Sequence, residues 1–283
     1  TALPEPISMT DAERQAKLAR AKGYPYLAPA HCYLFINGTA HEIGGFDRDP
    51  VLDGEIYVGD ELLSTVKFLR RLGIHDTAGL ARRTPVIAHG SNAAPEQLAR
   101  KFAGLDVDVI IPVMRGGLND FDVVYAAHFT AYGSIPATLE ASSGTTAEIA
   151  VIYLSDAQLA LMHGTEGLGA NYVYGRLGGI FLDVDGLDPL AEAFVYLTLR
   201  GAALLTGDPV ALSSVTAHRR RFRAQPTPAM LALARDRLAP GMGLDAFILE
   251  TIGDADLRRE RSTALHRESR RPSFSDFDVL VGG

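Results

Sequence analysis

The stretch from Thr84 to Val184 constrains the fold of this chain more than any other feature. It is a series of short apolar segments, rich in β-branched and aromatic residues and separated by loops that contain Gly, Ser and Pro. Segments of this kind are typical of β-strands. Because helices do not alternate with them in βαβ order, we predict a β-rich α+β domain. The predicted strands are Pro85–Ala88, Val107–Val113, Phe121–Phe129, Ala147–Leu154, Tyr172–Leu177 and Ile180–Val184.

Two helices are predicted within this stretch. Pro95 suits the first turn of a helix that continues to Phe102, because its missing N–H would be unpaired at that position in any case. Ser155–His163 is the second helix. The residues between the first strand and the first helix, 89–92, therefore form a strand-to-helix loop that contains a glycine.

The residues before Thr84 predict a helix, a hairpin and a second helix. Thr10 and Glu13 have the spacing of a capping box at the start of a helix that runs to Lys22. Asn37-Gly38 is typical of a tight hairpin turn. The elements predicted after the first helix are strands at Cys32–Ile36 and Thr39–Ile43, a loop at 44–54 and a helix at Asp60–Leu72 that Gly73 ends.

The residues after Asp188 have mostly helical patterns. The predicted helices are Pro189–Leu205, Pro209–Phe222, Thr227–Leu238 and Leu244–Thr251, and the charged stretch Arg258–Arg271 is expected to pack loosely on the surface. The chain is thus predicted to have an N-terminal extension at 1–83, a core at 84–187 and a mainly helical C-terminal section at 188–283.

The composition favours a globular protein that acts on a small molecule. Of the 283 residues, 47% are hydrophobic and 22% charged, and no run approaches the roughly 18 apolar residues of a membrane helix. A single cysteine excludes an internal disulfide, and Thr1–Met9 lacks the pattern of a signal peptide, so we expect a cytoplasmic protein without a membrane partner. A net charge of −7 argues against a nucleic-acid partner.

Two short segments carry the residues best suited to chemistry. In the loop His89-Gly90-Ser91-Asn92, consecutive backbone N–H groups could hold a carboxylate or an oxyanion. Glu166 follows the second helix and has glycines on both sides, so its carboxyl could project into a cavity. We therefore expect the two segments to meet, with a proton acceptor opposite anion-binding peptide groups.

The order of these segments resembles the γ-glutamylcyclotransferase-like family over about residues 84 to 184. In that family a strand ends in a Tyr-Gly-Ser-Asn-type loop, and His89-Gly90-Ser91-Asn92 stands in that place here. Each phrase is short, so the specificity lies in the ordered set. The phrases that follow in family order are Ile135-Pro-Ala-Thr-Leu139, Ser143-Gly144, Val151-Ile-Tyr-Leu-Ser-Asp156, Glu166-Gly167 and Tyr172.

The resemblance implies a mixed, β-barrel-like core of that family's type. It also implies a reaction in which the α-amine of a γ-glutamyl amide attacks its own side-chain carbonyl and releases 5-oxoproline and an amine. In this reaction Glu166 takes the general acid/base role, and no metal or nucleotide cofactor is involved. The implied partner is a small amide or amino-acid derivative. A homodimer is left open. The substrate-binding residues implied are His89, Gly90, Ser91, Asn92 and Tyr172.

Other functions and plainer interpretations stay open. An amide or lactam hydrolase could use water, or Ser91 with His89, His128 or His163 as its base, although the G-x-S-x-G elbow is absent. A non-enzymatic module that binds small ligands is the third reading. Without the surrounding phrases, Glu166 would be a solvated acid and the loop an ordinary helix cap. Tyr132-Gly133-Ser134 precedes Ile135-Pro136 rather than a helix, so we leave it out of the catalytic set.

Overall fold

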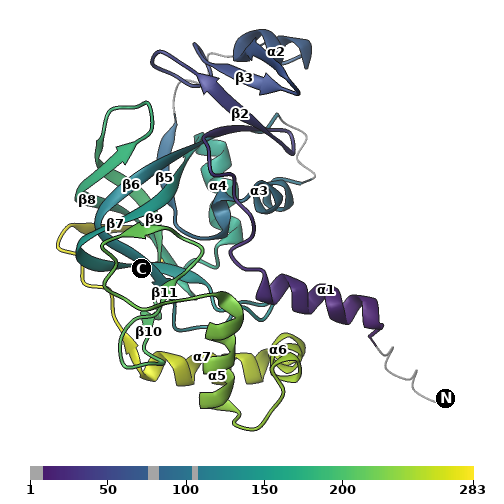
Figure 1. Ribbon diagram of the computed structural model, residues 1–283, viewed down its shortest axis with the longest axis vertical. Coiled ribbons are helices and arrows are strands. Elements are labelled where there is room, and N and C mark those ends of the chain that lie inside the picture. The colour runs from purple at the N-terminus through teal and green to yellow at the C-terminus, as the bar shows by residue number, and fades with distance from the viewer. Residues whose placement is uncertain (1–8, 76–82, 104–107) are drawn as a thin grey trace.

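The core of the protein is a closed ring of five strands. A computed structural model describes residues 9–75, 83–103 and 108–283 (Figure 1). The ring runs in the order β7, β5, β9, β8, β6 and back to β7, and only the β5–β9 pair within it is parallel. This confirms the α+β class and a barrel core. Its strands are β5 (Thr84–Ala88), β6 (Ile110–Tyr125), β7 (Ala137–Leu154), β8 (Tyr172–Val184) and β9 (Leu190–Thr198).

Strands that the sequence predicts as separate are joined in the barrel. The predicted Val107–Val113 and Phe121–Phe129 strands are both partly contained in β6, which begins at Ile110 and ends at Tyr125; Val107 itself lies outside the described residues. Gly116 interrupts the sequence pattern, yet a Cβ there would lie 2.5 Å from the Asp183 carbonyl oxygen, so glycine permits the backbone of β8 to approach. Tyr172–Leu177 and Ile180–Val184 likewise form β8, with an irregular register after Gly178.

Two predicted helices after Asp188 are wrong. Pro189–Leu205 contains β9, whose apolar segment Phe194–Leu197 pairs with β8 on one side and β5 on the other. Pairing on both edges decides the conformation there, whatever the local helix propensity. Pro209–Phe222 contains only short strands. The short strands of this region are β10 (Ala202–Ala203), β11 (Ala211–Leu212), β12 (Ala217–His218) and β13 (Ala224–Gln225).

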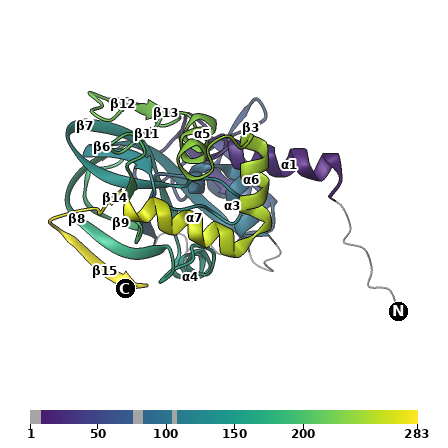
Figure 2. The same cartoon turned by 90° about the horizontal axis from the view of Figure 1, so that it is seen from below.

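Three helices follow, and they lie together at one end of the barrel, below its strands in Figure 1 and toward the viewer in Figure 2. They are α5 (Thr227–Leu238), α6 (Leu244–Gly253) and α7 (Ala255–Arg267), and the first two confirm their predicted positions. The expectation that Arg258–Arg271 packs loosely is wrong, because Arg261 is 6% exposed. Its guanidinium donates to the Phe247 carbonyl at 2.9 Å and lies 4.1 Å from that ring's centroid. The charged helix α7 is thus anchored by Arg261, whose buried guanidinium is hydrogen-bonded.

The N-terminal residues confirm the first helix and the hairpin. Thr10 and Glu13 form the reciprocal capping box of α1 (Asp11–Lys22). The hairpin consists of β1 (Tyr33–Ile36) and β2 (Thr39–Gly45), and β1 also pairs with β6. The hairpin therefore continues the barrel sheet.

The predicted helix Asp60–Leu72 is only half right. Its first residues form β4 (Glu61–Ser64), which pairs with β3 (Glu55–Val58), and the helix α2 is confined to Thr65–Arg71. The apolar pair Leu62 and Leu63 lies opposite Tyr57 and Ile56 in this hairpin, so strand pairing accounts for residues that also suit a helix face.

The remaining strands are β14 (Ser269–Arg270), paired with β10, and β15 (Phe277–Val281), which adds to β8. The division of the chain at residues 83 and 187 stays a prediction, and β9 brings a strand from beyond the second boundary into the barrel.

Within the described residues, no helix has both the length and the apolar character that a membrane crossing needs.

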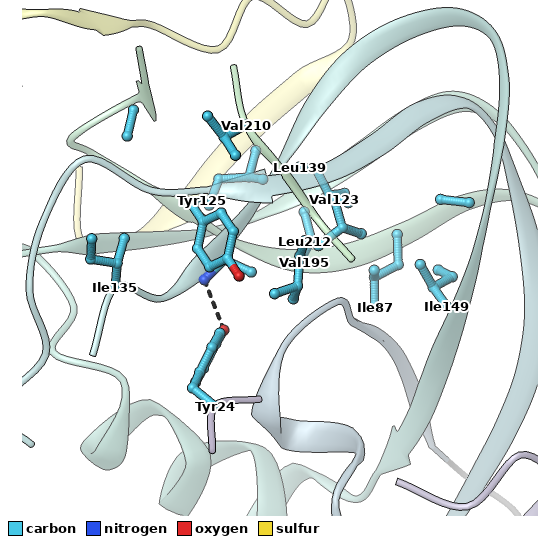
Figure 3. Packing of buried hydrophobic residues seen from close by; sticks show 14 of the residues in the cluster. Tyr24, Ile87, Val123, Tyr125, Ile135, Leu139, Ile149, Val195, Val210 and Leu212 are labelled. Atoms are coloured by element: carbon cyan, nitrogen blue, oxygen red, sulfur yellow. Dashed lines mark hydrogen bonds between the residues drawn. The ribbon is translucent and has the colours of Figure 1, made fainter. Parts of the chain in front are cut away.

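The interior of the barrel is apolar, and the side chain of Tyr24 reaches it from outside the sheet. Figure 3 shows Val123, Tyr125, Val195 and Leu212 around this interior, with Tyr24 approaching from the segment after α1. The dashed line marks the bond that the Ala137 N–H donates to the Tyr24 hydroxyl at 2.8 Å. Tyr24 therefore ties the N-terminal extension to β7.

One carboxyl group on β7 should make the stability of the barrel depend on pH. Glu140 is 5% exposed, its Oε2 has no partner among the described residues, and burial raises its pKa from 4.5 to about 7. Because the folded protein holds this proton more tightly than the unfolded chain, stability should fall as the pH rises from about 4.5 through 7. We expect Glu140→Gln to gain about 1–3 kcal/mol over the wild type at pH 8 and little at pH 5.

Urea denaturation of both proteins at pH 5 and pH 8 measures this difference. Glu61→Gln changes an exposed strand glutamate and serves as the control, since it should shift neither curve. A Glu140→Gln effect of the same size at both pH values would show that proton binding at this site is not the cause.

Candidate functional site

The loop predicted to bind substrate connects β5 to two short helical segments. After β5, residues 89 and 90 lead into the 3-10 turn η2 (Ser91–Ala93) and then α3 (Pro95–Lys101), with Pro95 at its first position as predicted. The backbone N–H groups of Gly90 and Ser91 donate to no acceptor among the described residues. Two adjacent peptide donors are therefore available to an anion.

The predicted acid lies where a helix ends. Ser155 and Gln158 form the capping box of α4 (Asp156–Thr165), and Glu166 is the first residue after this helix. Gly167 follows with a φ of 61°, which turns the chain away immediately. This turn holds Glu166 between α4 and the loop that leads to β8.

The two segments meet, as the sequence predicts. The Asn92 side-chain amide donates to Glu166 Oε1 at 2.8 Å across 74 residues of sequence. Lys101 donates to the same oxygen, and the side chains of Lys101 and Glu166 are 8% and 13% exposed. Glu166 Oε2 has no partner among the described residues. One carboxylate oxygen is thus fixed, and the other is free to exchange a proton.

Lys101 is the site residue that the sequence analysis misses. It ends α3, which packs against α4, so its ammonium reaches Glu166 through the contact between two helices. The available signal is the pair Arg100-Lys101, two cations at the end of the helix that begins beside the substrate loop. Sequence alone does not show which acid such a cation meets.

All six residues predicted for the site line one cavity of about 480 Å³. His89, Gly90, Ser91 and Asn92 come from the loop, Glu166 from the end of α4 and Tyr172 from the start of β8. Tyr132, which the sequence analysis leaves out, also lines it. The co-location of these residues follows from the structure, while their roles in binding and catalysis stay predictions.

The histidines of this cavity are neutral. His89 Nε2 donates to the Tyr196 carbonyl at 3.0 Å, which leaves Nδ1 without its proton, and burial lowers the pKa of this side chain. Burial also lowers the pKa of His128 to about 3. Neither ring bonds to Ser91, whose hydroxyl has no hydrogen-bond partner among the described residues. A serine nucleophile with a bonded histidine base is therefore not assembled here.

Two tyrosines supply neutral polar groups. Burial raises the pKa of Tyr172 well above its ordinary value, and the nearby Glu166 carboxylate adds to the effect. Burial has the same effect on Tyr24. The Tyr24 oxygen accepts the Ala137 N–H, so its own proton remains available for a ligand. These two tyrosines therefore add neutral hydrogen-bond donors beside the Glu166 carboxylate.

A second cavity, of about 550 Å³, shares Ala88, His89 and Gly90 with the first. Its charged lining consists of Arg115, Glu148 and Asp185, and Arg115 and Glu148 lie 4.0 Å apart. Neither Glu166 nor Lys101 lines it, so the predicted catalytic acid belongs to the smaller cavity. Among the residues that the structure describes, no group of three His, Cys, Asp or Glu side chains is arranged to hold a metal ion.

Gly90 is required for the close approach of Tyr24. A Cβ at position 90 would lie 2.5 Å from the Tyr24 hydroxyl oxygen, which the Ala137 N–H holds in place. We expect Gly90→Ala to displace the ring and to lower the free energy of unfolding by about 1–3 kcal/mol. Gly45→Ala is the matched control, because a Cβ there meets nothing within 4 Å. Equal urea midpoints for the two variants would contradict this account.

Comparisons with known proteins include a distant structural likeness. No protein-family model matches the chain, and no curated protein matches it. Among solved structures, a gamma-glutamyl cyclotransferase superposes with a TM-score of 0.34 and 11% sequence identity, over 69% of this chain and 92% of the other. A TM-score of 0.34 is too low to support a conclusion about activity, so any function has to rest on the residues of the cavity.

Proposed function

We propose that this protein is an enzyme that cyclises a γ-glutamyl amide, or a similar amino-acid amide, to 5-oxoproline and a free amine. The observation that carries the proposal is that Glu166, whose Oε2 has no described partner, lines the same cavity as Gly90 and Ser91, whose N–H groups donate to no described acceptor. The ordered phrases of residues 84 to 184, which resemble the γ-glutamylcyclotransferase-like family, agree with it.

Glu166 is the group that moves protons. It first acts as a base on the substrate α-ammonium, through the carboxylate oxygen that Asn92 and Lys101 leave unbonded. The α-nitrogen then bonds to the side-chain carbonyl carbon, and the amide C–N bond breaks. Overall, two protons pass from the α-nitrogen to the departing nitrogen, and Glu166 Oε2 can relay them in turn.

The loop residues bind negative charge. The N–H groups of Gly90 and Ser91 would receive either the glutamyl carboxylate or the oxyanion of the tetrahedral intermediate. Two further donors of the cavity, Tyr24 and Tyr172, stay protonated and can orient the substrate without adding charge. A cavity of about 480 Å³ is within the range of small-ligand sites, which is roughly 300–1,000 Å³.

The identity of the product tests the proposal. Purified protein is incubated with a panel of γ-glutamyl amino acids, and the products are separated by chromatography and identified by mass. Cyclisation releases 5-oxoproline, whereas attack by water releases glutamate. Glutamate as the product would replace the cyclotransferase proposal with an amide hydrolase, and absence of turnover across the panel would leave a ligand-binding module.

A further inference from the structure

The second, larger cavity has a floor where β6 and β8 pair. Arg115 lies directly opposite Asp185 there, because the Asp185 N–H donates to the Arg115 carbonyl at 2.9 Å and continues the register of Gly116 with Val184. Residues opposite each other in antiparallel strands have side chains on the same face, with Cβ atoms about 4.5–5.5 Å apart. Both residues line the cavity, and so does Gly117, which has no side chain to fill the space beside them.

These two opposite charges do not satisfy each other. Arg115 and Asp185, both within the described residues, form no ion pair. The Arg115 guanidinium is 23% exposed, and its one ion-pair contact in the described part of the chain, with Glu148 Oε2 at 4.0 Å, is too long for a hydrogen bond. Among the same residues, the Asp185 carboxylate accepts only from the Cys32 thiol, at 4.0 Å. The floor therefore presents a guanidinium and a carboxylate that are both available to a ligand.

Apolar side chains line the same cavity. They come from the segment after α1, which contributes Pro25 and Leu27, from Ile149 of β7 and from Val215 after β11. The volume of about 550 Å³ is within the range of small-ligand sites, roughly 300–1,000 Å³. A ligand that meets the two charges can thus also bury an apolar group.

We propose that this cavity binds a free α-amino acid with an apolar side chain. The carboxylate of the ligand bonds to Arg115, whose planar donors match two carboxylate oxygens, and its ammonium bonds to Asp185. An α-amino acid carries both groups on one carbon, so one small molecule can reach two side chains that start on opposite strand positions. A simple anion would meet the unpaired Asp185 carboxylate, and a simple cation would leave the guanidinium unbonded. The inference does not depend on the reaction proposed for the smaller cavity.

Leucine and two blocked derivatives of it test the proposal. Leucinamide lacks the carboxylate and N-acetyl-leucine lacks the ammonium, while both keep the side chain. Calorimetric titration of the full chain with each compound at millimolar concentration measures binding without turnover. We expect leucine to bind about tenfold more tightly than either derivative, because each derivative loses one charged hydrogen bond at a partly exposed site.

Each charged residue should control one of these two ratios. In Arg115→Gln, leucine should lose its advantage over leucinamide, and in Asp185→Asn it should lose its advantage over N-acetyl-leucine. Asp183→Asn is the matched control, because Asp183 is an exposed acid on the same face of β8 that lines neither cavity. This control should keep both ratios, and circular dichroism establishes that each variant is folded.

Glu166→Gln shows which cavity holds the amino acid. Glu166 lines the smaller cavity and not the larger one, so this variant should keep both ratios. Loss of leucine binding in Glu166→Gln, with binding unchanged in Arg115→Gln and Asp185→Asn, would place the amino acid in the smaller cavity and overturn the inference. A wild-type protein that does not bind leucine, or that binds it no better than the two derivatives, would overturn it as well.

Discussion

Glu166→Gln is expected to reduce kcat by about 10²- to 10⁴-fold, the range that positioned acid-base groups contribute. Glutamine has nearly the same shape and can keep the contact with Asn92, but it cannot accept a proton from the substrate ammonium. Rates of 5-oxoproline release under saturating γ-glutamyl substrate measure the effect. The variant also leaves Lys101 without its charge partner, so its folded fraction is measured alongside by circular dichroism.

Glu148→Gln is the matched control for this experiment. Glu148 lines the second cavity, where it contacts His218 and Arg115, and it has no part in the proposed reaction. The kcat of the Glu148→Gln variant should stay within about twofold of the wild-type value. Full activity of a folded Glu166→Gln protein would remove Glu166 from the mechanism.

Lys101→Met is expected to lower the free energy of unfolding by about 3 kcal/mol at pH 8. The Lys101 and Glu166 side chains are 8% and 13% exposed, so the substitution leaves a nearly buried carboxylate with Asn92 as its remaining donor. Removing one partner of a buried ion pair typically costs about 3–5 kcal/mol, and the slight exposure of this pair places it at the lower end. Urea denaturation measures the change.

The double variant Lys101→Met/Glu166→Gln decides whether charge is the cause. Replacing both partners with neutral groups of similar shape removes the unpaired charge, so we expect it to recover most of the lost stability. Lys67→Met, an exposed substitution on α2, should change the free energy of unfolding by less than about 0.5 kcal/mol. A double variant less stable than Lys101→Met alone would show that packing, and not the ion pair, dominates.

The sequence predicts the parts of the site that are local and misses the part that is tertiary. A glycine loop between a strand and a proline-started helix, and an acid just after a capped helix, are both short patterns that their own residues determine. Lys101 is different, because it reaches the cavity only through the packing of α3 against α4. A lysine at the end of a helix has no local signature that distinguishes it from a solvated one.

The predicted secondary structure is likewise right where the signal is local and wrong where a tertiary contact decides. Elements with capping or turn signals, such as the helix after Thr10 and the hairpin around Asn37-Gly38, are predicted within one or two residues. Leu190–Thr198 has no such signal, and it is a strand because β5 and β8 each offer it an unpaired edge. Glu61–Ser64 is a strand because β3 lies beside it. Pairing between distant residues decides these segments, and single-sequence patterns do not contain it.

The closed ring of strands determines when the barrel can close during synthesis of the chain. The parallel β5–β9 contact joins residues about a hundred positions apart, so the sheet keeps two open edges, on β5 and β8, until β9 has left the ribosome. Open edges invite pairing with other chains. The nascent chain therefore passes through a stage, after Val184 and before Thr198 has left the ribosome, in which both of these edges are open to pairing with another chain.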